Sequence, residues 1–253
     1  MSASHPTHWH EPSEVLAPGP VEIHVWKINL AAPADVARLE LFLSAEEREQ
    51  AARFHFVADQ RRFIIRRAVR RQLLAVCLEK KPEAVHIRFS SHGKPAIAGQ
   101  EGVAGLRFSC SHSADLGLVA LARGIELGVD LEQHRQLADA EGLAGTYFSD
   151  AEIRELAALP ESLKAAGFYN CWTRKEAFVK AIGLGLAFPL NRFSVSLAPG
   201  RPAALLDVAE EYGPATKWTM FLMEPRPDYS AALVFEGKAA PVKFFQWNSP
   251  KFD

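Results

Sequence analysis

The chain has 253 residues, of which 48% are hydrophobic and 23% are charged, and its formal net charge is −1. This length allows one large domain or two small ones, and the composition is that of an ordinary globular protein. A charge so close to zero argues against nucleic acid or an anionic membrane as the main partner, so any basic site must be local.

The cysteines and the first residues bear on the compartment. Cys77, Cys110 and Cys171 lack the spacing of metal ligands and are best explained as free thiols in a reducing cytoplasm. No apolar run is as long as a membrane span. Residues 1–20 lack the basic start and apolar block of a signal peptide, and we expect a flexible N-terminal tail. Its histidines, His5, His8 and His10, could bind a metal, but an unstructured polar leader is the simpler interpretation.

The first half of the chain has clear local patterns. Alternating apolar residues predict a strand over 21–30, and Ser44–Glu47 has the S-x-x-E pattern of a capping box that opens a helix. A longer helix is predicted over 59–78, with apolar residues on one side. Its other faces carry six arginines: Arg61, Arg62, Arg66, Arg67, Arg70 and Arg71. Strands are predicted at 85–90, 106–113 and 116–122.

The second half repeats this order. A strand is predicted over 125–132, and a second capping box, Ser149–Glu152, follows the first by 105 residues. A helix within residues 168–186, expected to stop at Gly183 and Gly185, stands in the place of the arginine-rich helix. We therefore predict an α+β fold of two similar halves related by internal duplication, a pseudo-twofold arrangement over 21–123 and 124–240, with a C-terminal tail over 241–253. The joint between halves is the natural place for a ligand, and a cleft within one chain favours a monomer.

Two acidic residues in the second half suggest a metal site. In a strand, residues two apart point the same way, so Asp130 and Glu132 share a face. Their repulsion would be relieved by a hard divalent cation, and Glu176 could add a third carboxylate from the helix. The alternative is that both residues lie at a strand end in water, and D-x-E alone does not decide between the two.

The helix predicted within residues 168–186 places Trp172, Glu176 and Lys180 four residues apart on one face. A surface ion pair beside a half-buried ring would explain them equally well. If phosphate is present, Lys180 is placed to bind it. In Ser111-His112-Ser113, at a strand end, the histidine could serve only as a structural hydrogen-bonding residue. The segment Gly93-Lys94-Pro95 could be a plain turn with a solvated lysine.

Taken together, these motifs resemble those of the 4′-phosphopantetheinyl transferases of the large, monomeric, Sfp-like type. The resemblance extends from about residue 21 to residue 235. It depends on four segments: Gly93-Lys94-Pro95, Ser111-His112-Ser113, Gly128–Glu132 and Trp172–Leu186. The fold of this family, two similar α+β halves with coenzyme A between them, agrees with the repeat.

The resemblance implies a reaction and a role for each motif. Asp130, Glu132 and Glu176 would hold Mg²⁺, with Mn²⁺ as a substitute, on the pyrophosphate of coenzyme A. Glu176, or a water it orients, would take the proton of a serine on an apo acyl or peptidyl carrier protein, with Lys180 as its catalytic partner. The serine would attack the β-phosphate and release 3′,5′-ADP. The remaining coenzyme A contacts would be Ser111, His112, Lys180 and the turn Gly93, Lys94 and Pro95, which would flank the adenine.

One position departs from the family pattern. Relatives place a basic residue for the 3′-phosphate on the helix after the first capping box, where this chain has Gln50. We expect Arg53 or Arg62 to replace it. Leu137, Leu143 and Tyr147, which follow the acidic strand, are expected to help form the docking surface for the carrier. Two alternatives remain: a metal-dependent phosphoesterase or nuclease that uses the same carboxylates, and a non-catalytic module that binds coenzyme A or a carrier.

Overall fold

The computed structural model describes residues 7–99, 105–136, 139–185, 188–238 and 240–249. Its α-helices are α1 (Val36–Glu40), α2 (Ala45–Ala52), α3 (Val57–Leu78), α4 (Ala140–Tyr147), α5 (Asp150–Ala158) and α6 (Glu161–Ile182). Its strands are β1 (Ile23–Asn29), β2 (Ile87–Phe89), β3 (Pro95–Ile97), β4 (Leu106–Ser113), β5 (Leu116–Arg123), β6 (Leu127–Gln133), β7 (Ser194–Val195), β8 (Leu205–Asp207), β9 (Trp218–Met223), β10 (Tyr229–Glu236) and β11 (Val242–Trp247).

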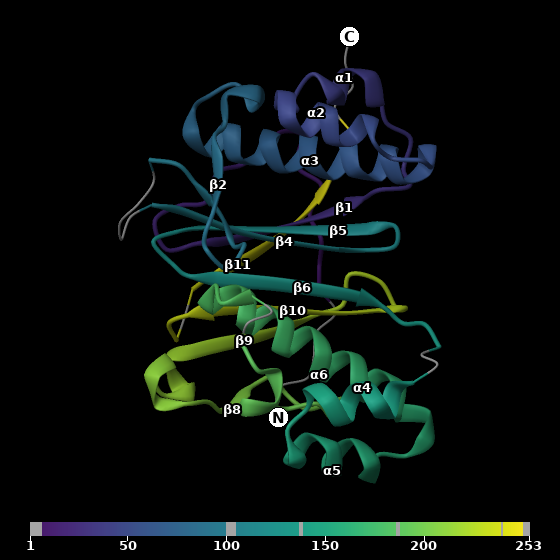
Figure 1. Cartoon of the computed structure of the whole chain (residues 1–253). Coiled ribbons are helices and arrows are strands. Elements are labelled where there is room, and N and C mark those ends of the chain that lie inside the picture. The colour runs from purple at the N-terminus through teal and green to yellow at the C-terminus, as the bar shows by residue number, and fades with distance from the viewer. Residues whose placement is uncertain (1–6, 100–104, 137–138, 186–187, 239, 250–253) are drawn as a thin grey trace.

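Two sheets lie face to face in the middle of the molecule, each covered by a long helix (Figure 1). One sheet has the order β11-β1-β5-β4 and packs against α3. The other has the order β6-β10-β9 and packs against α6. A third apolar cluster fills the space between the sheets, with Val25 and Leu118 on one side and Val129 and Leu233 on the other. The α+β class expected from the sequence is confirmed.

The order of elements repeats between the halves. Ser44 and Ser149 each form a complete capping box, with Glu47 and Glu152 respectively. The helices that follow, α3 and α6, have 22 residues each. Each is followed by a short antiparallel pair, β2–β3 or β7–β8. The landmarks of the sequence repeat are therefore matching elements of the structure.

Strand β1 differs from its predicted pattern. Strict alternation would put Ile23 and Val25 on the buried side and Trp26 on the solvent side, but Trp26 is 1% exposed and packs in the core under α3. Ile23 and Val25 pack in the layer between the sheets. The strand is buried on both faces because a helix covers one side of its sheet and the second sheet covers the other.

The C-terminal prediction was wrong. Residues expected to form a tail contain β11, which pairs in parallel with β1 at the edge of the first sheet. Part of the expected N-terminal tail is attached there too, because the His10 amide donates to the Phe244 carbonyl at 3.0 Å and the Trp9 ring contacts the Phe244 ring. His5 lies outside the described residues. Among the helices that the structure describes, none is long and apolar enough to cross a membrane.

Gly128 explains how α6 comes so close to β6. A Cβ atom at this position would lie 2.0 Å from the backbone oxygen of Ala177 and 2.4 Å from the backbone nitrogen of Ala181. Only glycine allows the helix backbone to rest on the strand here. This close approach brings Lys180 of the helix to Asp130 of the strand.

We expect Gly128→Ala to lower the free energy of unfolding by about 2 kcal/mol, because the added methyl group forces α6 away from β6. Gly117→Ala is a matched control, since a Cβ there would make ordinary contacts, the nearest at 3.7 Å. Urea unfolding of both variants measures the difference. Equal losses of stability in the two variants would contradict this explanation of Gly128.

Candidate functional site

Strands β4 and β6 run side by side where the two sheets meet. The Ser109 hydroxyl accepts a hydrogen bond from the Val129 amide at 3.0 Å, and the Ser113 hydroxyl accepts one from the Gln133 amide at 3.1 Å. Because side chains alternate along a strand, the hydroxyl at position 111 points toward β6 as well. The serines of β4 thus fasten the first half of the chain to the acidic strand of the second.

The two carboxylates of β6 point into the same site. Asp130 is 3% exposed, and its Oδ1 accepts hydrogen bonds from Ser111 Oγ and Lys180 Nζ, both at 2.7 Å. Its Oδ2 is buried and has no hydrogen-bond partner among the described residues. Glu132 Oε2 accepts a hydrogen bond from Ser113 Oγ at 2.8 Å. A buried carboxylate oxygen without a partner is costly, and a cation would relieve that cost.

Helix α6 supplies the third carboxylate. Trp172, Glu176 and Lys180 line the same cavity as Asp130 and Glu132, and its volume is about 520 Å³. The face that the four-residue spacing predicted is therefore present. Ala177, Phe178 and Ala181, on the other side of the helix, are buried in the core.

The negative charges of the three carboxylates repel one another. Burial, together with the negative charges of Asp130 and Glu132, raises the pKa of Glu176 despite Lys180. Burial and the charge of Asp130 raise the pKa of Glu132 despite the Ser113 hydrogen bond. Burial opposes the positive charge of Lys180, but Asp130 outweighs this effect and the pKa of Lys180 is raised.

These residues fit a divalent cation in their chemistry. Oxygen donors from three carboxylates, one of them with an unpartnered buried oxygen, are the ligands that Mg²⁺ prefers. In the part of the chain that the structure describes, no group of three or more His, Cys, Asp or Glu side chains is already arranged as a ligand set. Lys180 Nζ donates to Asp130 Oδ1, and Asp130, Glu132 and Glu176 are the residues that would hold the cation.

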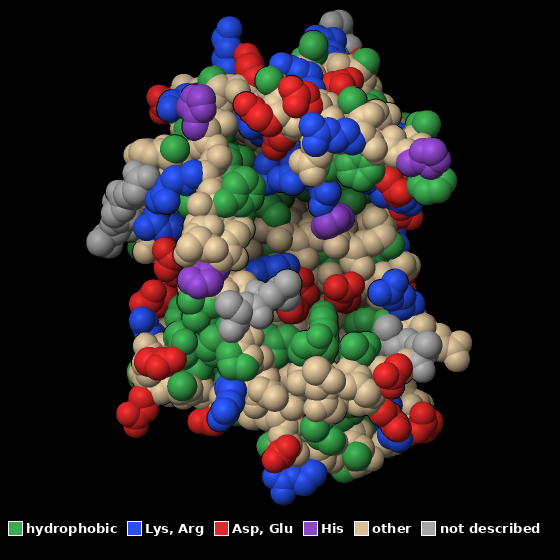
Figure 2. All heavy atoms as spheres, viewed as in Figure 1, with side chains coloured by type: hydrophobic (Ala, Val, Ile, Leu, Met, Phe, Trp, Pro, Cys, Tyr) green, Lys and Arg blue, Asp and Glu red, His purple; other side chains and the backbone are tan. Residues whose placement is uncertain are grey.

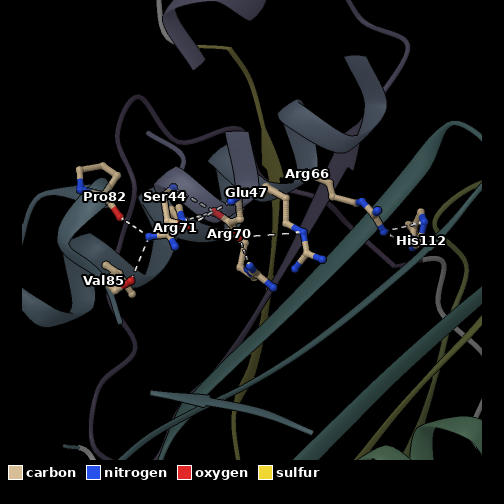
Figure 3. Close-up of polar contacts among 9 residues, drawn as sticks. Ser44, Glu47, Arg66, Arg70, Arg71, Pro82, Val85 and His112 are labelled. Carbon is tan, nitrogen blue, oxygen red and sulfur yellow. Dashed lines mark hydrogen bonds and ion pairs between the residues drawn. The ribbon is translucent and has the colours of Figure 1, made fainter. Parts of the chain in front are cut away.

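Helix α3 forms the opposite wall of the cavity with Arg66, Arg67 and Arg70. In Figure 2, Lys and Arg side chains gather on the α3 side of a hollow at mid-height, and Asp and Glu side chains lie on the α6 side. In Figure 3, Arg66 points toward His112, whose Nε2 lies 2.7 Å from Arg66 Nη1. The cavity therefore has one basic wall and one acidic wall.

The first capping box anchors the basic wall. Arg70 donates to Glu47 Oε1 at 2.6 Å, and Arg71 donates to Glu47 Oε2 (Figure 3). Arg71 Nη1 also donates to the backbone oxygens of Pro82 and Val85, each at 2.9 Å. One carboxylate thus orients two arginines, while excess positive charge remains at the cavity.

The basic wall has unsatisfied donors and crowded charge. Burial and the charge of Arg70 lower the pKa of Arg66, and burial with both neighbouring arginines lowers the pKa of Arg67 to about 10. Although His112 reaches the surface, burial of its ring and the charges of Arg66, Lys180 and Arg67 lower its pKa to about 4. The Nε atoms of Arg66, Arg67 and Arg70 are buried without a hydrogen-bond partner in the described structure. A bound polyanion would neutralise the positive charge of this wall.

The arginines expected from the sequence lie elsewhere. Arg53 is exposed and pairs with Glu49 at 3.8 Å. Arg62 pairs with Asp115 at 2.7 Å and also with Asp59. Neither lines the cavity. Arg66, Arg67 and Arg70 were visible in the sequence as members of the arginine-rich helix. Positions 66 and 67 lie four and three residues before position 70, and this helical spacing, which places all three on one face, could have directed attention to them.

The remaining predicted residues divide between three places. Lys94 and Pro95 line a separate cavity with Glu126, and Gly93 has a positive φ of 82° in the turn before them. Tyr147 is 38% exposed, and its ring packs edge-on against Trp172 at 5.5 Å. Leu143 packs at the edge of the second core. Leu137 lies outside the described residues.

Comparisons with known proteins match both halves. A model of the 4′-phosphopantetheinyl transferase superfamily matches residues 126–234, and one of the 4′-phosphopantetheinyl transferase N-terminal region matches residues 31–123. The 4′-phosphopantetheinyl transferase HetI of Nostoc sp. strain PCC 7120 is 34% identical over 227 residues, which cover 89% of this chain and 92% of that protein.

Two further relatives agree. A phosphopantetheinyl transferase of Thraustochytrium sp. is 30% identical over 87% of this chain and 81% of its own length. The 4′-phosphopantetheinyl transferase Sfp of Bacillus subtilis strain 168 is 28% identical over 63% of this chain and 69% of its own length. The two model matches adjoin at the boundary between the structural halves. The chain therefore belongs to the 4′-phosphopantetheinyl transferase superfamily, and it is an Sfp-like phosphopantetheinyl transferase.

Proposed function

We propose that this transferase moves the 4′-phosphopantetheine arm of coenzyme A to a serine of an apo acyl or peptidyl carrier protein, in a Mg²⁺-dependent reaction at the cavity between its halves. The observation that carries the proposal is the pairing of a basic wall on α3 with three carboxylates on β6 and α6. A polyanionic substrate needs the first wall, and a cation that binds its phosphates needs the second.

Coenzyme A would lie with its phosphates along the basic wall. Arg66, Arg67 and Arg70 line this side of the cavity, and Lys180 reaches it from α6. His112, with its pKa lowered to about 4, is uncharged at neutral pH. A bound phosphate would counter the positive charges around the His112 ring and favour its protonation. The protonated ring would in turn bind the phosphate more tightly.

The acidic wall would perform the transfer. Asp130, Glu132 and Glu176 would hold Mg²⁺, or Mn²⁺ in its place, which when bound neutralises charge on the pyrophosphate oxygens. Glu176, whose pKa is raised, would take the proton of the carrier serine. The serine oxygen would form a bond to the β-phosphorus as the bond to the bridging oxygen breaks, and 3′,5′-ADP would leave. Lys180 would stabilise the charge on the phosphoryl oxygens.

The carrier would dock beside Trp172, which lines the cavity and contacts Tyr147 of α4, and Leu143 lies on the same helix. We expect Leu143→Glu to raise KM for the carrier about tenfold, because a charge would have to be buried in an apolar contact, and to leave KM for coenzyme A unchanged. Steady-state kinetics with each substrate varied in turn measures both values. An unchanged carrier KM would remove α4 from the docking surface.

The proposal is tested by intact-mass spectrometry of an apo acyl carrier protein after incubation with this protein, coenzyme A and Mg²⁺. A parallel sample contains EDTA. A mass gain of one phosphopantetheine arm that disappears in EDTA is the expected result. Cleavage of coenzyme A with an unmodified carrier would point to a phosphoesterase. Binding of coenzyme A without turnover on several unrelated carriers would point to a non-catalytic module.

We infer further that one chain is the working unit and that it functions in a reducing cytoplasm. Both walls of the cavity come from the same chain, which supports a monomer. Cys77, Cys110 and Cys171 are free thiols, which supports a reducing compartment.

A further inference from the structure

Lys94, in the turn between β2 and β3, is bound tightly by other parts of the protein. Its Nζ donates to Glu126 Oε2 and to the backbone oxygen of Ala181, each at 2.8 Å, and its side chain is 19% exposed. Glu126 directly precedes β6, and Ala181 lies in the last turn of α6. Lys94 therefore connects the hairpin of the first half to two elements of the second half.

The contact with Ala181 lies at a helix end that needs a donor. Carbonyl groups in the last turn of a helix lack a partner within the helix, and they carry the negative end of its dipole. Helix α6 ends at Gly183, with φ of 76°. The Lys94 ammonium satisfies one of these carbonyls. Lys180 directly precedes Ala181, so the turn that Lys94 holds is also the turn that presents Lys180 to Asp130.

Two glycines give the hairpin room to approach this helix end. A Cβ atom at Gly183 would lie 2.9 Å from Lys94 Cδ. A Cβ atom at Gly185 would lie 2.6 Å from the backbone oxygen of His92. Both glycines have positive φ, 76° and 56°. The close contact between hairpin and helix end is therefore built into the backbone on both sides.

Glu126 keeps the Lys94 ammonium in place. Burial disfavours the charge of this carboxylate, but hydrogen bonds and charges from Lys94 and Arg107 outweigh burial and lower the pKa of Glu126. The Arg107 Nε donates to Glu126 Oε1 at 2.6 Å. The carboxylate is thus ionised at neutral pH, and the ion pair persists across the range in which a transferase would be assayed.

We propose that Lys94 is a positioning residue, which ties the hairpin and the start of β6 to the end of α6 and so keeps Lys180 and Glu176 aligned with Asp130. This role differs from the contact with adenine that the family resemblance implied for the turn. The predicted effect of Lys94 on activity rests on the transfer reaction proposed above. The charge of Lys94 is then used within the protein, and the loss of that charge acts on the chemical step.

The test compares Lys94→Met, Lys94→Arg, Glu126→Gln and the double variant Lys94→Met/Glu126→Gln in the full chain. Lys94→Met keeps an unbranched apolar side chain over Gly183 and removes the ammonium group, with its charge and its two hydrogen bonds. We expect kcat to fall about tenfold, with KM for coenzyme A changed less than about threefold. The same fold loss is expected with 3′-dephospho-coenzyme A as donor. Lys94→Arg should recover most of the activity, and the double variant should be no slower than the slower single variant.

Three results would overturn the proposal: an unchanged kcat in Lys94→Met, a rise in KM for coenzyme A of about tenfold without a change in kcat, or losses that multiply in the double variant. Melting temperatures of the same four variants give a readout that needs no transfer. Losses in melting temperature that are non-additive between Lys94 and Glu126 are expected, and additive losses would overturn the link. If the wild-type chain modifies no carrier, the proposed function fails while the melting data still decide whether Lys94 holds Glu126.

Discussion

Glu176→Gln should lower kcat for phosphopantetheine transfer by about three orders of magnitude and should raise the melting temperature at neutral pH. The amide has nearly the shape of the carboxylate, but it can neither accept the serine proton nor bind a cation by charge. Kinetics of carrier modification at saturating coenzyme A measures the first effect, and thermal unfolding measures the second.

The gain in stability follows from the direction of the pKa shift. Burial and the charges of Asp130 and Glu132 raise the pKa of Glu176 above its ordinary value of 4.5, so the folded protein binds this proton more tightly than the unfolded chain. The favourable contribution is therefore present at acid pH and is lost as pH rises through the raised pKa. In a buffer free of divalent cations, the variant should be more stable than the wild type at pH 7, and the difference should disappear below pH 4.5.

Glu161→Gln is the matched control, since Glu161 begins the same helix and is 88% exposed beside Lys164. It should leave kcat within about twofold of the wild type, as expected of an exposed pair. Asp130→Ala removes a second carboxylate of the acidic wall by a substitution in β6 instead of α6. Transfer retained in both Glu176→Gln and Asp130→Ala would contradict the metal site and the assignment of the base together.

Arg66→Gln should raise KM for coenzyme A by roughly 10- to 100-fold while kcat at saturation stays within about threefold, because one charge-assisted hydrogen bond to a phosphate is lost. Arg66 lines the cavity, contacts His112 and has a buried Nε without a hydrogen-bond partner in the described structure. Varying coenzyme A at a saturating carrier concentration gives both constants. The effect should shrink as ionic strength rises.

Arg62→Gln, one helical turn earlier on α3, is the control for this prediction. Arg62 is bound by Asp115 and Asp59 and does not line the cavity, so its loss should change KM for coenzyme A less than about twofold. The opposite pattern would be a high KM for coenzyme A in Arg62→Gln and an unchanged KM in Arg66→Gln. It would support the sequence-based expectation that Arg62 binds the 3′-phosphate, and it would contradict a coenzyme A site along the basic wall of α3.

Local patterns in the sequence were sufficient to predict the elements that form the proposed site. Alternation predicted that Asp130 and Glu132 share a face of a strand, and helical spacing predicted that Glu176 and Lys180 share a face of a helix. The capping boxes at Ser44 and Ser149 located two helix starts and revealed the duplication. These features depend on neighbours a few residues away, and the physical preferences that produce them are already present in a short segment.

The packing of the two halves against each other determines which residues line the cavity and which distant segments lie side by side. The choice of Arg66 over Arg62 depends on where α3 crosses the cavity, and the partners of Lys94 come from 32 and 87 residues away in the chain. The burial of Trp26 and the pairing of β11 with β1 likewise follow from layers formed by distant segments. A sequence pattern reports the period and polarity of one element. The identity of the element packed against it depends on tertiary structure, because hydrophobic burial is non-directional and only the complete arrangement of layers assigns each face its partner.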